Sequence, residues 1–465
     1  MFAAAFFFLG WASQPLGLGY LDPVGKIVPQ DENVYAHASL HMAERGDWAT
    51  PHFMGRFFLY KPPMVYWTAA ASVKLLGRSD FALRLPSRLA AAAVCLLVFL
   101  WTRRYAAALL LAATPLFAEV ANRTLTDALL CFWMVLAFWL LHRKQSWLGF
   151  GIVSGLAILT KSTAGLIPLL VYFGYWLLTR KQTVWWKPWA ASAVAAVVAA
   201  PWFVYQFVVH PRWFWAEFVQ VELLAYGAGA PPQQTAGETV WNFYGARIAA
   251  TALAVVLGAI FASWKWPPRE PQTLLLAVWI ALMVAAILSY QYRNIPYLVP
   301  LLPALAIVAG RWATWLPALL SMALLWFALP GTEPPPVRRA LDRRAAMQRS
   351  NEVLIIDLAE QFYATTLPLS KVRYVLPAAE QPPEGFALDF RRLGITMPVQ
   401  RFLQGGFDAY RRQMKEWGLP NDEALATVIE YRSRDEINEL IAASPEADIV
   451  WPDGRMRLGS AIMPR

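Results

Sequence analysis

The sequence predicts an α-helical polytopic membrane protein that carries a small soluble α/β domain after about residue 330. Two observations lead to this class. Of the 465 residues, 58% are hydrophobic and only 15% are charged, and the mean hydropathy is +0.38. A soluble domain is about half apolar and a quarter charged. In addition, apolar runs of spanning length follow one another before the composition turns polar.

The apolar runs give about eleven membrane spans, because a spanning helix needs roughly 20 apolar residues. They lie at 2–20, 86–101, 105–121, 126–141, 147–160, 163–178, 188–209, 246–264, 272–290, 295–310 and 314–330. We expect the first run to be a spanning helix rather than a cleaved signal, because it has no basic residue before it.

Short basic loops set the predicted orientation. Basic residues mark the loops at 103–104, 143–144, 180–187, 265–269 and 311. Basic short loops stay on the cytoplasmic side of a membrane. The long loops 21–85 and 210–245 are therefore expected on the outer face. The prediction divides the chain into a transmembrane domain, 1–330, and an extracytoplasmic domain, 331–465.

The residues after 331 alternate between strand and helix patterns. Strands are expected near 353–358, 371–377, 426–431 and 448–452, and helices near 359–367, 407–417 and 432–444. Such alternation predicts a small sheet covered by helices. From 350 on, the sequence has no Gly-rich phosphate loop, no His and no Cys, so we assign this domain no chemistry.

The net charge of +10 does not indicate a nucleic-acid partner, because the basic residues occur singly or in pairs. Charge in cytoplasmic loops and anionic head groups explain this distribution better. The two cysteines, Cys95 and Cys131, both lie in apolar runs. We expect them to be packing residues, which excludes a disulfide framework and a cysteine metal site.

Two features of the first outer loop can carry chemistry. Asp31 and Glu32 form an acidic pair that can act as a general base or can cap the helix expected to end near Gly46. Lys61 is followed by two prolines, which hold it on a stiff turn. A fixed ammonium at the outer surface suits a phosphate, although a lysine that merely reaches the interface is a common alternative.

Further charges sit at the predicted outer boundary, where cations oppose the insertion preference and indicate an anionic ligand. Arg123 and Asp127 are four residues apart and are expected to pair with each other. Lys161 lies in a tight turn, and Tyr292 and Arg293 lie at the start of a proline-rich run. In the second long loop we expect surface positions for Glu217, Glu222, Glu238 and Arg247.

The order of these motifs resembles the GT-C glycosyltransferases, in particular the superfamily of protein O-mannosyltransferases and lipid A aminoarabinose transferases. Asp-Glu at 31–32 is followed by Tyr35, Gly-Asp-Trp at 46–48 and Tyr-Lys-Pro-Pro at 60–63. Arg-x-x-x-Asp at 123–127, Leu-Thr-Lys at 159–161 and a Tyr-Leu-x-Pro run from 297 extend the match.

The resemblance implies a role for each matching position. Asp31 matches the catalytic acid, with Glu32 beside it, and Lys61 matches the lysine that meets the carrier phosphate. Arg123 and Arg247 are expected to assist Lys61. The remaining residues expected at the substrate are Tyr35, Asp127, Lys161, Tyr292 and Arg293.

A metal ion is expected from only part of this superfamily. The aminoarabinose branch has an acid where this chain has Tyr60, and it has a histidine in the loop where residues 216–245 contain none. Both positions ligate a metal in that branch, so these departures argue against a divalent ion. We therefore assign no metal ligand and no cofactor.

The resulting prediction is an inverting glycosyltransferase of the cell envelope that uses a polyprenyl-phosphate-linked hexose or pentose. The acceptor would be a hydroxyl or phosphate of a lipid, glycan or protein, and no nucleic acid is involved. We expect a multi-pass protein of the bacterial inner membrane, with its site facing the periplasm. The alternative is a transporter or flippase of a lipid-linked sugar, for which inverted repeats and charged mid-membrane helices are typical.

Overall fold

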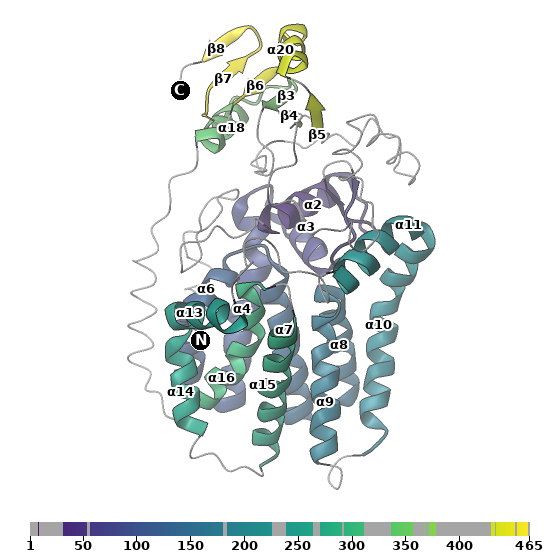
Figure 1. Cartoon of the computed structure of the whole chain (residues 1–465), viewed down its shortest axis with the longest axis vertical. Coiled ribbons are helices and arrows are strands. Elements are labelled where there is room, and N and C mark those ends of the chain that lie inside the picture. Colours follow the sequence, from purple (N-terminus) through teal and green to yellow (C-terminus); the bar gives the residue numbers. More distant parts are fainter. Residues whose placement is uncertain are drawn as a thin grey trace.

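The computed structural model shows a bundle of long helices with a small sheet domain beyond one of its ends (Figure 1). The structure describes residue 8 and residues 31–53, 56–179, 184–225, 239–263, 270–290, 293–310, 336–356, 367, 372–377, 429–432, 434–451 and 453–463. The spans expected at 2–20 and 314–330 lie essentially outside these residues.

Four of the described helices are long and apolar enough to cross a membrane. They are α4 (Asp80–Thr102), α7 with its extension η1 (Thr126–Lys144), α10 (Lys187–Val209) and α15 (Pro271–Ser289). The pair α13 (Val240–Thr251) and α14 (Leu253–Ser263) is a fifth candidate, although it bends by 98°. The polytopic helical class is confirmed, whereas the number of eleven spans stays a prediction.

Prolines divide two of the remaining apolar runs into shorter helices. Pro115 divides the run expected at 105–121 into α5 (Tyr105–Ala112) and α6 (Pro115–Ala121). Proline lacks an amide hydrogen and is favoured in the first turn of a helix, where no intrahelical hydrogen bond is lost. The run expected at 295–310 likewise begins as the 3₁₀ helix η5 (Ile295–Leu301) before α16 (Leu302–Ala309). Between them in the chain lie α8 (Trp147–Lys161), η2 (Ala164–Leu166) and α9 (Ile167–Leu178).

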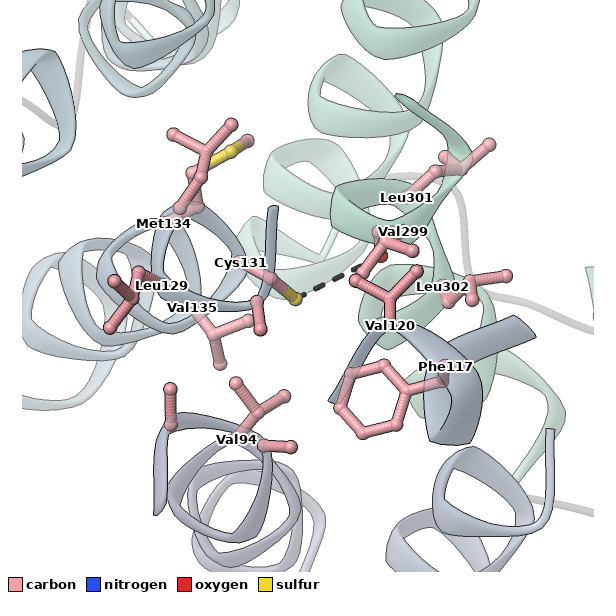
Figure 2. Packing of buried hydrophobic residues seen from close by; sticks show 14 of the residues in the cluster. Val94, Phe117, Val120, Leu129, Cys131, Met134, Val135, Val299, Leu301 and Leu302 are labelled. Carbon is pink, nitrogen blue, oxygen red and sulfur yellow. Dashed lines mark hydrogen bonds between the residues drawn. The ribbon is translucent and has the colours of Figure 1, made fainter. Parts of the chain in front are cut away.

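The core of the bundle lies where α4, α6, α7 and η5 meet. Figure 2 shows Cys131 on α7 pointing towards Val299 of η5, with Phe117 and Val120 of α6 beside them. The Cys131 Sγ donates to the Val299 carbonyl at 3.8 Å. Cys95 and Cys131 are both free and buried, so their prediction as packing residues is confirmed.

The first outer loop folds into α2 (Asp31–Arg45), a short hairpin of β1 (His52–Phe53) and β2 (Arg56–Phe57), and α3 (Met64–Leu76). Asp31 and Glu32 occupy the first turn of α2, where their negative charges stabilise the positive end of the helix dipole. The helix stops where Gly46 takes a φ of +77°, and the Gly46 amide donates to the Met42 carbonyl at 3.0 Å. The predicted helix stop is confirmed.

The chain after residue 335 forms α18 (Pro336–Ala346) and a six-stranded sheet. Its order is β5 (Ile429–Arg432), β4 (Val372–Pro377), β3 (Val353–Ile356), β6 (Asp448–Val450), β7 (Met456–Leu458) and β8 (Ala461–Met463). The first four strands are parallel and the last two are antiparallel. The four predicted strands and the helix α20 (Arg434–Ala443) are present. The helices expected at 359–367 and 407–417 lie outside the described residues, apart from residue 367.

This sheet domain packs on α2, α3 and α4 through buried apolar side chains. In Figure 1 it lies beyond the end of the bundle that carries α2 and α3. One apolar cluster joins Leu40 of α2 and Val73 of α3 to Leu341 of α18 and Val353 of β3. Arg338 pairs with Asp80 at 3.3 Å. The domain therefore lies at the same end of the bundle as the first outer loop.

Candidate active site

Hydrogen bonds from distant helices hold the segment between α2 and α3 in place. The Asp47 carboxylate accepts from the amides of Ala49 and Thr50 at 3.1 Å each, so it closes a local turn. The Ala49 carbonyl accepts from Trp202 at 2.8 Å and from Gln206 at 2.7 Å, both on α10. The Gly-Asp-Trp motif thus builds the scaffold of this loop rather than contacting the cavity described below.

A second tie fixes the end of the same loop. Glu217 lies on η3 (Phe214–Ala225), the π-helix that follows α11 (Pro211–Trp213). Its Oε2 accepts from the Leu59 amide at 2.7 Å, and the side chain is fully buried. Lys61 comes two residues later and stands just before Pro62 and Pro63, at the start of α3. The lysine is therefore held from both sides, as its proline context predicts.

Lys61 forms an ion pair with Glu222, five residues beyond Glu217 on η3. The Lys61 side chain is 15% exposed and that of Glu222 is 4% exposed. The surface positions expected for Glu217, Glu222 and Arg247 are wrong, because all three are buried. The sequence does not show this burial, because the partners of Glu217 and Glu222 are Leu59 and Lys61, which lie more than 150 positions away.

Asp127 and Lys161 form a second buried pair. Asp127 lies in the first turn of α7, and Lys161 is the last residue of α8. The Lys161 Nζ donates to the Asp127 Oδ1 at 2.6 Å and lies 4.4 Å from the centre of the Tyr297 ring on η5. The expected pairing of Arg123 with Asp127 is wrong, since Asp127 turns towards α8 and Arg123 turns towards α2 and α6.

Asp31, at the start of α2, lies within electrostatic range of both pairs. Burial raises the pKa of its carboxyl, and the ammonium groups of Lys61 and Lys161 work against this increase. Tyr35 follows one turn later, and its ring centre is 5.9 Å from that of Tyr66. Burial and then the charge of Asp31 raise the pKa of Tyr35. A carboxylate poised in this way can take a proton from an incoming group.

The two lysine pairs line a cavity of about 340 Å³. Its polar residues include Lys61, Asp127, Lys161, Glu222, Tyr290 and Tyr297. Its apolar wall comes from α7, α9 and α15 and includes Leu130, Ile167, Leu170, Met283 and Ile287. A polar end beside an apolar wall built by membrane helices matches a ligand with a charged head and a hydrocarbon tail.

Glu32 points into a separate buried network. Arg84 of α4 donates to its carboxylate from Nε at 2.6 Å and from Nη2 at 2.8 Å, and the Thr124 amide donates at 2.9 Å. Arg123 lies 3.7 Å from the Glu32 Oε2 and 3.3 Å from Glu119. This geometry suits a residue that positions α2, and thereby Asp31, better than a second catalytic group.

Among the predicted site residues that the structure describes, six do not line the cavity: Asp31, Glu32, Tyr35, Arg123, Arg247 and Arg293. Arg247 on α13 donates to the Phe243 carbonyl at 2.7 Å and lies 3.8 Å from the centre of the Phe243 ring. Arg293 interacts electrostatically with Tyr244, which lies on α13 like Arg247. Tyr292 lies outside the described residues. Contact of these groups or of Arg123 with a substrate stays a prediction.

A donor set for a divalent metal is not formed by the part of the chain that the structure describes. Position 60 is a tyrosine rather than a carboxylate. Within the described ranges, no three His, Cys, Asp or Glu side chains gather as a metal donor set. The chemistry considered below therefore contains no step through a metal.

Comparison with known proteins gives one family match and many relatives. Residues 60–205 match the family model described as dolichyl-phosphate-mannose-protein mannosyltransferase. The chain is 30% identical over 321 residues to undecaprenyl phosphate-alpha-4-amino-4-deoxy-L-arabinose arabinosyl transferase 2 of Pseudomonas fluorescens. This alignment covers 63% of this chain and 54% of that protein. It is 31% identical over 330 residues to the corresponding transferase of Pseudomonas aeruginosa, which covers 63% and 57%.

The chain thus spans about half the length of the curated relatives that it matches. Among solved structures, ArnT from Cupriavidus metallidurans bound to undecaprenyl phosphate superposes with a TM-score of 0.67 at 16% identity, covering 97% of this chain and 91% of that one. The same protein in the apo state gives 0.64. The resemblance predicted from the motifs is confirmed, and the chain is a polytopic membrane protein with the GT-C glycosyltransferase fold.

Proposed function

We propose that this protein transfers a sugar from a polyprenyl-phosphate carrier to a hydroxyl or phosphate acceptor at the outer face of a membrane. The observation that carries the proposal is the cavity, in which Lys61 and Lys161 stand at the end of an apolar wall from α7, α9 and α15. Such a wall suits the prenyl chain, and the ammonium groups suit the phosphate. The names of the relatives support an amino-pentose as the sugar.

The reaction begins with the acceptor beside Asp31. Its carboxylate takes the proton of the acceptor hydroxyl while the acceptor oxygen attacks the anomeric carbon from the face opposite the phosphate. The bond from that carbon to the carrier oxygen breaks, and polyprenyl phosphate leaves with the bonding electrons. One direct displacement inverts the anomeric centre. An acceptor phosphate needs no proton removal, so Asp31 would then orient it.

The cations stabilise the leaving group. Lys61 sits on a rigid turn and carries a compact charge that can meet the developing phosphate charge without reorganising. Lys161 provides a second positive charge in the same cavity. The carrier phosphate is the group that leaves the anomeric carbon, so the donor sugar needs no nucleotide.

A transporter of the same lipid would need a path for its head group through the bundle. The charged pairs described above instead gather at the end of the bundle that carries α2 and the sheet domain. In a bacterial cell this end would face the periplasm, with the helices in the inner membrane. The acceptor would be a lipid, a glycan or a protein of the cell envelope.

The test uses purified protein in lipid nanodiscs with short-chain polyprenyl-phosphate sugars and a cell-envelope extract as the source of acceptor. Release of polyprenyl phosphate is measured for the wild type and for Asp31→Asn. Asp435→Asn, an exposed change on α20, is the matched control. The proposal expects release by the wild type and the control and none by Asp31→Asn. Equal release by all three proteins would remove Asp31 from the reaction.

A further inference from the structure

Glu222 has an oxygen that the ion pair leaves unused. Its Oε1 pairs with Lys61, whereas its Oε2 is buried and has no hydrogen-bond partner among the described residues. The side chain is 4% exposed and lines the cavity. A buried carboxylate oxygen without a donor costs free energy, because it has lost its hydration and gained no hydrogen bond in return. A bound ligand that offers a hydrogen-bond donor would recover this free energy.

The position of Glu222 restricts which part of the ligand can provide this donor. This step rests on the proposed function, in which Lys61 binds the carrier phosphate. The anomeric carbon of the sugar is joined to an oxygen of that phosphate, so the sugar lies next to Lys61 and therefore next to Glu222. The prenyl chain offers no donor. Within the carrier-linked sugar, a hydroxyl or an amino group of the sugar is therefore the group that can donate to Oε2.

The charges around the cavity favour an amino group. Lys61 and Lys161 are already paired with Glu222 and Asp127, and Asp31 adds a third carboxyl group nearby. The donor phosphodiester brings one more negative charge into the same space. A neutral sugar leaves this excess uncompensated, whereas an ammonium group on the sugar offsets it. Charge-assisted hydrogen bonds are also about twice as strong as neutral ones.

We propose that Glu222 is the specificity-determining residue for the donor sugar and that its Oε2 binds a cationic amino group on the sugar ring. Glu222 then bridges the two halves of the donor head group. Its Oε1 holds Lys61 at the phosphate, and its Oε2 binds the amine. The cavity thereby selects amino sugars over neutral sugars of the same size.

The experiment compares two donors that differ in one group. One is short-chain polyprenyl phosphate linked to 4-amino-4-deoxy-arabinose, and the other carries a hydroxyl in place of the amine. The kcat/KM for release of polyprenyl phosphate is measured for the wild type, Glu222→Gln, Glu222→Asp and Glu217→Gln in nanodiscs. Glu217→Gln is the matched control, since Glu217 lies on the same helix and bonds the Leu59 amide instead.

The wild type is expected to prefer the amino donor by roughly 10- to 100-fold, the range of one charge-assisted hydrogen bond. Glu222→Gln should lose most of this preference, mainly through slower reaction of the amino donor. Glu222→Asp keeps the carboxylate and should retain part of the preference, and Glu217→Gln should retain all of it. Circular dichroism reports whether each variant is folded. Binding of sugar-free polyprenyl phosphate reports the position of Lys61 and should change little in Glu222→Gln, because the amide oxygen can still accept from Lys61.

Two results would overturn the inference while leaving the proposed function intact. In one, the wild type uses both donors equally well. In the other, Glu222→Gln slows both donors by the same factor, as expected if Glu222 only positions Lys61. If Glu222→Gln fails to fold, the wild type is compared with an N-acetylated donor, and equal use of it overturns the inference. No release from any donor would refute the proposed function and the inference together.

Discussion

Replacement of Glu32 provides a quantitative test of the network that positions α2. The carboxylate accepts three hydrogen bonds, two from Arg84 and one from the Thr124 amide, at 2.6–2.9 Å. The Arg84 and Glu32 side chains are only 2% and 6% exposed. Glu32→Ala therefore leaves a buried guanidinium without its main counter-ion, and breaking such a pair costs about 3–5 kcal/mol.

The double variant separates this cost from a catalytic role. In Glu32→Ala with Arg84→Met the buried charge is also removed, and replacement of a whole buried pair is often neutral. Recovery should be partial, because the Thr124 amide still lacks its acceptor, which costs about 1–3 kcal/mol. We expect the double variant to unfold at a denaturant concentration between those of the wild type and Glu32→Ala, and to retain turnover.

The assay follows unfolding of the purified protein in mixed micelles of a mild detergent and SDS. Glu439→Gln, an exposed change on α20, is the matched control and should stay within about 0.5 kcal/mol of the wild type. A loss of less than about 1 kcal/mol in Glu32→Ala would refute the buried network. A stable double variant without turnover would indicate that Glu32 takes part in the reaction itself.

Further predictions concern Lys61, Asp31 and the buried histidines. Lys61→Met should weaken binding of polyprenyl phosphate by roughly 10- to 100-fold, whereas Lys61→Arg should weaken it less. Equal affinity of Lys61→Met and the wild type for polyprenyl phosphate would exclude this lysine from the phosphate site. Because burial raises the pKa of Asp31 above 3.8, kcat/KM should rise with pH along a limb displaced upward from that value, and a limb at the ordinary value would contradict burial of the base. Burial lowers the pKa of His41 to about 3 and of His52 to about 4, from 6.5. The unfolded chain then binds more protons than the folded one, so the stability is fully present above about pH 6.5 and falls as the pH drops towards 4. The double variant His41→Asn with His52→Asn should flatten this decline in thermal unfolding curves. An unchanged decline would contradict the contribution of these two histidines.

Local features of the site could be predicted from the sequence. The lysine before two prolines, the acids at the start of a helix and the helix stop at Gly46 each depend on neighbouring residues. The structure places them as expected. The order of these motifs also sufficed for the fold, which the superposition on ArnT confirms. The charge of the short loops predicts that the first outer loop and the domain after residue 331 lie on the same side of the membrane. In the structure α2, the cavity and the sheet domain do lie at one end of the bundle.

The pairing of charges could not be predicted, because it depends on tertiary contacts. Lys61 meets Glu222, which is 161 positions away, and Lys161 meets Asp127, 34 positions away. Helical spacing suggested Arg123 for Asp127, but an α-helix begins between them at Thr126. The two therefore never share a helix face. The antiparallel pair of β7 and β8, whose strands are three residues long, was not predicted.

The most direct test of the proposed site is a cryo-electron microscopy structure of Asp31→Asn bound to a polyprenyl-phosphate amino-sugar in nanodiscs. We expect the phosphate within hydrogen-bond distance of Lys61 and the prenyl chain along α7, α9 and α15. The sugar should lie between Glu222 and residue 31. A head group bound at Arg247 or Arg293 instead, with the cavity at Lys61 empty, would refute the proposed site.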